Sequence, residues 1–160
     1  MTESNTAERC LTCELAARRE SGQAPLWDDI YRSQYWYVVH SFNTALPGWL
    51  VVICKRHIAA IDEMTDAEAV ELGLLIRRVS LSLREVVGCD KTYVAQFAEA
   101  KEHPHVHFHV MPRMADQPAE YRGPNIFKYL GVPEVDRVSE DRMNKIAAAV
   151  RRSLTELSKG

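Results

Sequence analysis

The spacing of hydrophobic residues along the chain predicts several β-strands, because successive side chains of a strand point to opposite faces. A nearly continuous hydrophobic run from Trp49 to Lys55 is typical of a central strand that is covered on both sides. A later strand has three histidines alternating with valine and phenylalanine, and Pro112 is expected to end its pairing because proline cannot donate to a sheet ladder. The other expected strands span residues 30–32, 35–41 and 92–98.

Three other segments have hydrophobic residues at helical spacing. Thr65 and Glu68 form a capping box at the start of the longest helix, and Gly88 is expected to stop it. Residues 115–135 are expected to be irregular because they include three prolines and two glycines. The expected helices run from about 11 to 21, from the Thr65 cap to about 87, and from a Ser139 cap near residue 139 onward.

These elements predict an α+β fold with a mostly antiparallel sheet of about five strands, one long helix and a C-terminal helix. A chain of 160 residues is long enough for one hydrophobic core, so residues 10–160 are expected to form a single domain. Its C-terminal extension is expected from about residue 139, and the polar residues 1–9 are expected to form a disordered tail.

Composition then narrows the classes of function. A formal net charge of −2 gives no basic field, so nucleic acid is not an expected partner. No hydrophobic run approaches the roughly 18 residues of a membrane span, so no membrane association is expected. The first nine residues lack a hydrophobic signal segment, which predicts a cytoplasmic location with reduced thiols.

Candidate chemistry is concentrated in the histidine-rich strand. His105, His107 and His109 alternate with hydrophobic residues and are expected to share one face, with neighbouring imidazoles roughly 6–7 Å apart. Two kinds of site use such an arrangement. One is a metal site, because neutral imidazole is a common zinc ligand, and the other is nucleophilic catalysis by one imidazole that its neighbours orient.

The cysteines suggest a second centre. Cys10 and Cys13 form a CxxC pair, which in a reducing compartment indicates a metal knuckle or a redox site. A redox motif would require a strand before the pair, and none is expected there. The sequence also has no second CxxC pair to complete four metal ligands. Cys54, inside the central hydrophobic run, is expected to be a small core residue.

The run from His105 to Met111 resembles the histidine triad (HIT) superfamily of nucleotide hydrolases and transferases. Pro112 and Arg113 after it are similar to the branch that includes dinucleoside polyphosphate hydrolases, and residues 46–58 resemble the strand and turn before the family's long helix. The resemblance implies a five-stranded antiparallel sheet, a homodimer and a nucleotide substrate. His107 would be the nucleophile, and His105 and His109 would shape its surroundings.

The resemblance also implies binding residues, although the chain departs from the family pattern. Trp49 stands where the family usually has a supporting histidine, and residues 100–104 replace a Gly-Gln-Ser/Thr run that contacts phosphates. His103 could then protonate the leaving group. A His-Pro-His register similar to galactose-1-phosphate uridylyltransferase would instead make His105 the nucleophile, and the alternation of the three histidines disfavours it. The expected nucleotide-binding residues are Gln96, Ser41, Asn43 and Lys101.

Zinc-bearing bacterial members of the family are similar in their two N-terminal cysteines, the histidine after the third strand and the first triad histidine. This likeness implies a structural zinc ion held by Cys10, Cys13, His57 and His105, with His103 as an alternative fourth ligand. Three hypotheses follow for function: a nucleotide hydrolase or transferase that forms a nucleotidyl-histidine, a nucleotide-binding regulatory module, and metal-assisted hydrolysis by zinc on the three triad histidines.

Overall fold

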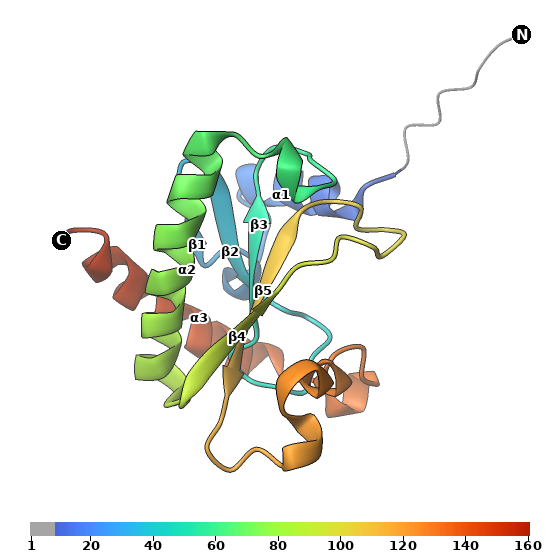
Figure 1. Cartoon of the computed structure of the whole chain (residues 1–160), viewed down its shortest axis with the longest axis vertical. Helices are drawn as coiled ribbons and strands as arrows, with labels where there is room; N and C mark the ends of the chain where they lie inside the picture. The colour runs from blue at the N-terminus through green and yellow to red at the C-terminus, as the bar shows by residue number, and fades with distance from the viewer. Residues whose placement is uncertain (1–8) are drawn as a thin grey trace, which may run out of the picture.

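A five-stranded antiparallel sheet is the centre of the computed structural model, which describes residues 9–160 (Figure 1). The predicted tail therefore lies outside the described residues, except for Arg9. The strand order is β1-β2-β3-β5-β4, and every neighbouring pair is antiparallel. The strands are β1 (Tyr31–Arg32), β2 (Trp36–His40), β3 (Leu50–Cys54), β4 (Lys91–Ala95) and β5 (His107–Arg113).

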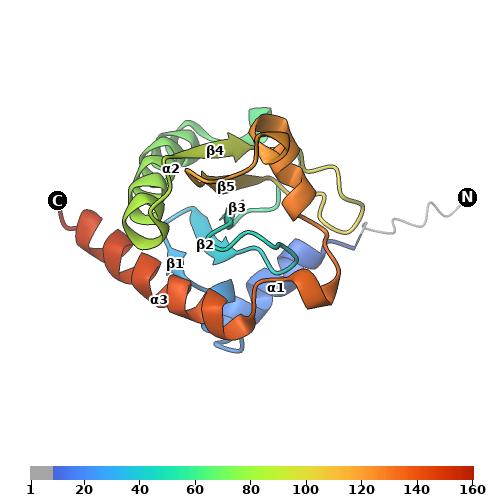
Figure 2. The ribbon, with the colours of Figure 1, turned by 90° about the horizontal axis from the view of Figure 1, so that it is seen from below.

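Helices cover one face of the sheet. The long helix α2 (Asp66–Val87) and the C-terminal helix α3 (Glu140–Leu157) pack there on alternate strand residues such as Val52, Phe108 and Val110. The opposite face has its own smaller core, which includes Trp49, Val51 and Met111 and is covered partly by α1 (Leu11–Glu20) and a 3-10 segment (Gly123–Tyr129). Figure 2 shows the sheet between these two layers. The predicted α+β fold is confirmed.

The predicted helix signals act as expected. The Thr65 hydroxyl accepts a hydrogen bond from the Glu68 amide at the start of α2, and Gly88 ends the helix with a φ of 69°. Ser139 caps α3 by accepting from the Arg142 amide. Each cap satisfies backbone groups that the helix itself leaves without partners. Residues 115–135 contain short 3-10 segments and no α-helix or strand, as predicted.

Pro112 does not end β5, which is a correction to the prediction. β5 continues to Arg113, and Pro112 pairs in register with Thr92 of β4. The carbonyl of Arg113 accepts from Asp90 on the β4 side, so the backbone of Pro112 faces the other neighbour, β3. The last β3–β5 pair is Leu50 with Val110, so Pro112 lies beyond the paired part of β3. The missing N–H of the proline therefore removes no hydrogen bond from the ladder.

The predicted strand boundaries differ at two further points. β5 begins at His107, so His105 lies in the segment before the strand rather than in it. β4 ends at Ala95 instead of Ala98, whose backbone φ of 56° is left-handed and incompatible with an extended strand. Both differences come from the loop between the two strands, which leaves the sheet and contacts α1 through a hydrogen bond from the Leu11 amide to the Glu102 carbonyl.

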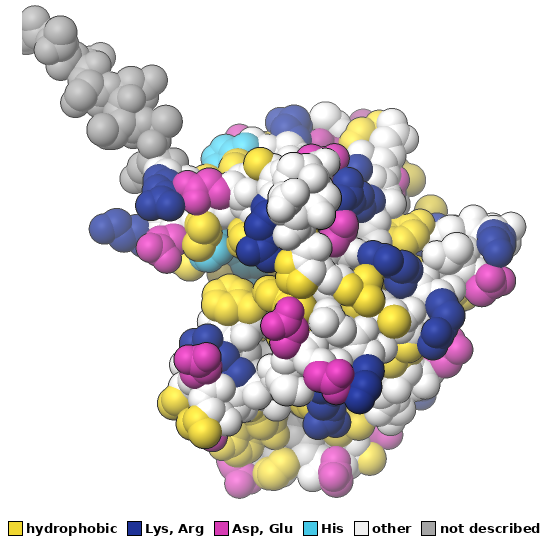
Figure 3. Space-filling view, turned by 180° about the vertical axis from the view of Figure 1, so that it is seen from behind, with side chains coloured by type: hydrophobic (Ala, Val, Ile, Leu, Met, Phe, Trp, Pro, Cys, Tyr) yellow, Lys and Arg dark blue, Asp and Glu magenta, His cyan; other side chains and the backbone are white. Residues whose placement is uncertain are grey.

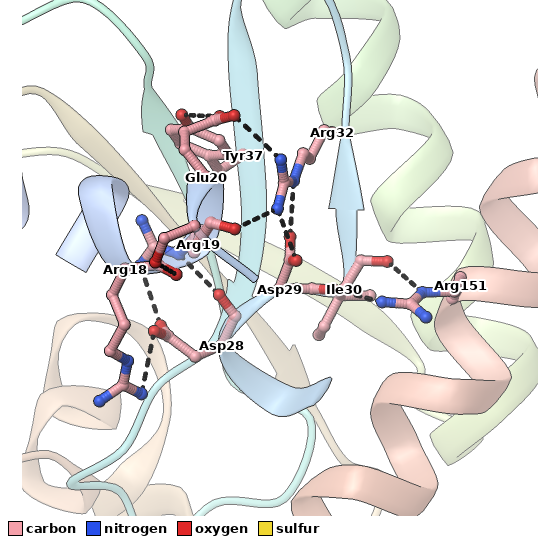
Figure 4. A network of polar contacts seen from close by, with 10 residues as sticks. Arg18, Arg19, Glu20, Asp28, Asp29, Ile30, Arg32, Tyr37 and Arg151 are labelled. Carbon is pink, nitrogen blue, oxygen red and sulfur yellow. Dashed lines mark hydrogen bonds and ion pairs between the residues drawn. The ribbon is translucent and has the colours of Figure 1, made fainter. Parts of the chain in front are cut away.

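A buried ion pair attaches α1 to the 3-10 segment Leu26–Asp28, which precedes β1 (Figure 4). The Arg19 guanidinium donates to the carboxylate of Asp28 at 2.9 Å and to its carbonyl at 2.6 Å, and both side chains are almost completely buried. Arg32 donates to the Arg19 carbonyl and to Asp29, which connects the end of α1 to β1. Removing one member of such a pair leaves an uncompensated buried charge, typically at a cost of about 3–5 kcal/mol.

No helix among residues 9–160 is both long enough and hydrophobic enough to cross a membrane.

Candidate functional site

The second and third histidines of the triad lie side by side on the face of β5 opposite α2 and α3. His107 and His109 pair in register with Ile53 and Val51, which belong to the smaller core on that face. Their ring centroids are 5.0 Å apart and their planes meet at 80°. The strict alternation with Phe108 causes this arrangement, because residues two apart on a strand share a face.

Hydrogen bonding sets which nitrogen of His107 is free. Its Nδ1 lies 2.7 Å from the backbone carbonyl of His105. A carbonyl can only accept, so Nδ1 carries the proton and Nε2 keeps its lone pair. A neutral imidazole with a free lone pair on Nε2 can act as a nucleophile.

A hydrogen bond to the backbone fixes the orientation of the His105 ring. Its Nε2 donates to the Cys54 carbonyl at 2.6 Å, which leaves the lone pair of Nδ1 free for another partner. The residue is 1% exposed, and burial lowers the pKa of the imidazole, which favours the neutral ring. His105 therefore presents a ligand nitrogen on a side chain that cannot turn freely.

Four potential metal ligands converge beside this nitrogen. The ligand atoms of Cys10, Cys13, His57 and His105 all lie within 4.8 Å of one another, so this cluster can bind a metal ion. Burial, followed by the contact with Cys10, raises the pKa of the Cys13 thiol to about 11. A bound cation would have to displace that proton, as cations do when they bind cysteine.

Three segments that are distant in the sequence build the cluster. The start of α1 supplies the cysteines, the turn after β3 supplies His57, and the segment before β5 supplies His105. Backbone hydrogen bonds join them, from Leu11 to Glu102 and from Val106 to Ile58. Figure 3 shows histidine side chains at the surface close to where the described chain begins.

His103 lies outside this cluster. Its Nδ1 is 2.8 Å from the hydroxyl of Thr12, the buried residue between the two cysteines. Burial, and then the charge of His107, lower the pKa of His103. The structure thus brings His105 into the group of ligands and places its alternative, His103, beside Thr12.

Two predicted nucleotide-binding residues lie in the loop between β4 and β5. Gln96 directly follows Ala95, the register partner of His109. Its amide nitrogen is buried and has no hydrogen-bond partner among the described residues. Lys101 is exposed further along the same loop.

The other two lie beyond the end of β2. Ser41 is buried and its hydroxyl donates to the Asn43 side chain at 3.2 Å. Val39 shares a row of the sheet with His109, so Ser41 lies roughly 7 Å further along the strand direction. These residues are therefore not packed against His107, and they are closer to the row of His109.

Two histidine contacts near these segments were not expected from the sequence. His40 donates from Nδ1 to the Ser41 carbonyl and accepts at Nε2 from the Gly48 amide, and burial lowers its pKa to about 4. It therefore links the loop after β2 to the turn before β3. Its position inside a hydrophobic strand was the available signal, because a histidine there must be buried.

The second contact involves Trp49. Its indole N–H donates to Nδ1 of His109 at 3.0 Å, and Phe127 packs edge-on against both rings. Burial, and then the charge of His107, lower the pKa of His109 to about 4. The sequence shows that Trp49 stands where the family usually has a histidine, but it does not show that the indole contacts His109.

Comparisons with known proteins identify the family and the fold. A model of the HIT domain matches residues 28–116. A Zn-bound histidine triad family protein from Mycobacterium smegmatis is 20% identical, with 94% of this chain and 96% of that chain covered and a TM-score of 0.67.

Two further solved structures are similar in fold. A hypothetical histidine triad nucleotide-binding protein from Sulfolobus tokodaii is 15% identical over 91% of this chain and 94% of that chain, with a TM-score of 0.67. Diadenosine triphosphate hydrolase from Plasmodium falciparum is 16% identical over 79% of this chain and 76% of that chain, with a TM-score of 0.59.

Proposed function

The chain belongs to the HIT domain family, and on that premise we propose that it is a nucleotide hydrolase or nucleotidyl transferase, similar to the dinucleoside polyphosphate hydrolases. The observation that carries this proposal is the hydrogen bond from Nδ1 of His107 to the His105 carbonyl, which leaves Nε2 as a free nucleophile. The likeness to a nucleotide-binding protein and to a diadenosine triphosphate hydrolase supports a nucleotide substrate.

The proposed reaction has two steps. Nε2 of His107 attacks the α-phosphorus, the bond from phosphorus to the leaving-group oxygen breaks, and its electron pair stays on that oxygen, which takes up a proton. Water or another acceptor then attacks the nucleotidyl-histidine, loses a proton and releases neutral His107. Splitting one displacement into two through an enzyme nucleophile is the general logic of covalent catalysis.

The remaining residues have supporting roles in this proposal. His109 contacts the phosphoryl group beside the nucleophile. His103 supplies the proton for the leaving group from its protonated form, which the lowered pKa makes the minor form at neutral pH. The unpartnered amide of Gln96 and the exposed ammonium of Lys101 contact phosphate oxygens. Ser41 and Asn43 contact the ribose, and their place beyond the row of His109, two and four residues after Val39, is compatible with a nucleoside that extends away from the nucleophile.

A regulatory module that binds nucleotides with little turnover is the alternative. It is favoured by the replacement of the Gly-Gln-Ser/Thr run by residues 100–104. Hydrolysis by a metal on all three triad histidines has less support, because the ring nitrogens do not face one common point. Nδ1 of His105 faces the cysteines, whereas Nδ1 of His107 donates a hydrogen bond to the His105 carbonyl.

Turnover of variants tests the proposed catalytic roles. Diadenosine polyphosphates and adenosine phosphoramidates are offered to the wild type, and the substrate that it turns over is then used with His107→Asn and His103→Asn. We expect His107→Asn to lower kcat by several orders of magnitude and His103→Asn by roughly 10²–10⁴-fold, the range typical of a general acid. Wild-type turnover by His107→Asn would refute the nucleophile assignment. Tight nucleotide binding by the wild type without turnover would favour the regulatory alternative.

We further propose that the cluster of Cys10, Cys13, His57 and His105 holds a structural zinc ion. In tetrahedral coordination with ordinary zinc bond lengths, two nitrogens are roughly 3.3 Å apart, and a nitrogen and a sulfur are roughly 3.6 Å apart. The two histidine Nδ1 atoms are 3.2 Å apart, and the nitrogen–sulfur contacts are 3.3, 3.5 and 3.7 Å. The donor set and its spacing therefore fit zinc.

Zinc there would supply a cross-link between three chain segments. The hydrogen bond from Nε2 of His105 to the Cys54 carbonyl supports this role, since metal-binding histidines usually donate their other N–H to an acceptor. His105 cannot also be the nucleophile, because both ring nitrogens are engaged in this arrangement.

Metal analysis of protein purified without chelator tests the zinc proposal. We expect about one equivalent of zinc in the wild type and in His103→Asn, and a large loss in Cys13→Ser, because a structural site needs all of its ligands. Cys89→Ala is the matched control, since Cys89 is a buried thiol outside the cluster. Less than about a tenth of an equivalent in the wild type would contradict the proposal, and zinc loss in His103→Asn would reassign the fourth ligand.

We also propose a homodimer that uses the outer face of α2 and the edge strand β4. Val70, Leu74 and Leu81 are 69%, 54% and 38% exposed on one side of α2. Gly73 lies among them, and a Cβ added to it would meet no atom within 4 Å. A mid-helix glycine costs about 1 kcal/mol relative to alanine, and close approach of a second helix gives a reason for it that packing within the chain does not.

Light scattering on size-exclusion fractions tests the dimer. We expect a mass of about twice the 18.2 kDa of one chain for the wild type. Leu74→Glu should shift the protein toward the monomer, because it places a charge in the hydrophobic contact. Val135→Glu is the control, since Val135 is 89% exposed away from α2. A wild-type monomer at micromolar concentration would overturn the proposal.

A further inference from the structure

Trp49 is placed to control one histidine of the site. It is fully buried at the start of β3, and its indole N–H donates to Nδ1 of His109 at 3.0 Å. The edge-on contacts of Phe127 with both rings, at centroid distances of 5.3 and 5.5 Å, restrict how either ring can turn. The contact is therefore rigid as well as directional.

An indole nitrogen can only donate a hydrogen bond. Nδ1 of His109 must therefore accept, and the proton of the neutral imidazole lies on Nε2. A histidine in place of Trp49 could donate or accept, so it would leave the tautomer of His109 undetermined. Protonating His109 on Nδ1 would also set two N–H groups against each other, so the indole favours the neutral ring.

We propose that Trp49 is a positioning residue that holds His109 as a neutral donor, with Nε2–H directed to a phosphoryl oxygen of the substrate. The second half of this statement depends on the proposed nucleotide chemistry, whereas the tautomer does not. The lowering of the pKa of His109 to about 4 by burial agrees with a ring that stays neutral.

The two adjacent histidines then have opposite polarity. The carbonyl of His105 accepts from Nδ1 of His107, so His107 presents a lone pair on Nε2. The indole of Trp49 donates to Nδ1 of His109, so His109 presents a proton on Nε2. With ring centroids 5.0 Å apart, one ring can attack phosphorus while the other binds an oxygen of the same phosphoryl group.

Histidine tautomers measured by long-range proton–nitrogen NMR correlations test the proposal without a substrate. We expect wild-type His109 to be protonated on Nε2 and not on Nδ1, with its signals assigned by their loss in His109→Asn. Trp49→Phe keeps an aromatic ring but removes the donor, and we expect it to give a mixture of tautomers or the Nδ1–H form. Phe127→Leu is the matched control, because it changes the packing around His109 but retains the indole, and its tautomer should be unchanged.

Turnover gives the second measurement. Loss of one oriented donor should reduce kcat of Trp49→Phe by about 10-fold to 100-fold, with a smaller change in KM, because the bond strengthens as charge develops on the phosphoryl oxygen. An Nδ1–H tautomer in the wild type overturns the proposal, even if Trp49→Phe does not fold. An unchanged tautomer in a folded Trp49→Phe also overturns it. The predicted tautomers in a protein that turns over no nucleotide would refute the proposed function and the catalytic role of Trp49, but would confirm its control of His109.

Discussion

The arrangement of the site depends on His105, which uses three polar groups at once. Its Nε2–H is bonded to the Cys54 carbonyl, its Nδ1 faces the cysteines and His57, and its own carbonyl accepts from Nδ1 of His107. The position of one residue therefore determines both the fourth corner of the metal-binding cluster and the free nitrogen of the candidate nucleophile. The same residue therefore joins the cluster to the histidine row through its backbone carbonyl.

The surrounding fold keeps these three connections in register. β3 and β5 pair from Leu50 to Ile53, which aligns Cys54 with the segment that carries His105. α1 brings the cysteines to the same place. Its other end is attached to the segment before β1 by the buried Arg19–Asp28 pair and to β1 by Arg32. The cluster and the histidine row are thus parts of one rigid unit, although they come from segments about 90 residues apart in the chain.

Local patterns were sufficient to predict the helices, the existence of the strands and the shared face of His107 and His109, because each depends on residue spacing or on a cap. They did not predict that β4 ends at Ala95 or that His105 precedes β5. The convergence of Cys10 and Cys13 with His57 and His105 came from the family resemblance, since the CxxC pair alone could not identify distant ligands. The contacts of Trp49 with His109 and of Thr12 with His103 could not be predicted, because they depend on side-chain directions across neighbouring segments. Pro112 was misjudged because its effect depends on which neighbour its backbone faces, and this follows from sheet order rather than composition.

If the carbonyl of His105 accepts from Nδ1 of His107 during turnover, Nε2 of His107 is the attacking atom. The most direct measurement is to quench the reaction during turnover and determine which nitrogen of which histidine carries the nucleotide, by peptide mass spectrometry and phosphorus NMR. We expect a nucleoside monophosphate bonded to Nε2 of His107. A nucleotide on Nδ1 of His107, or on any other histidine, would contradict it.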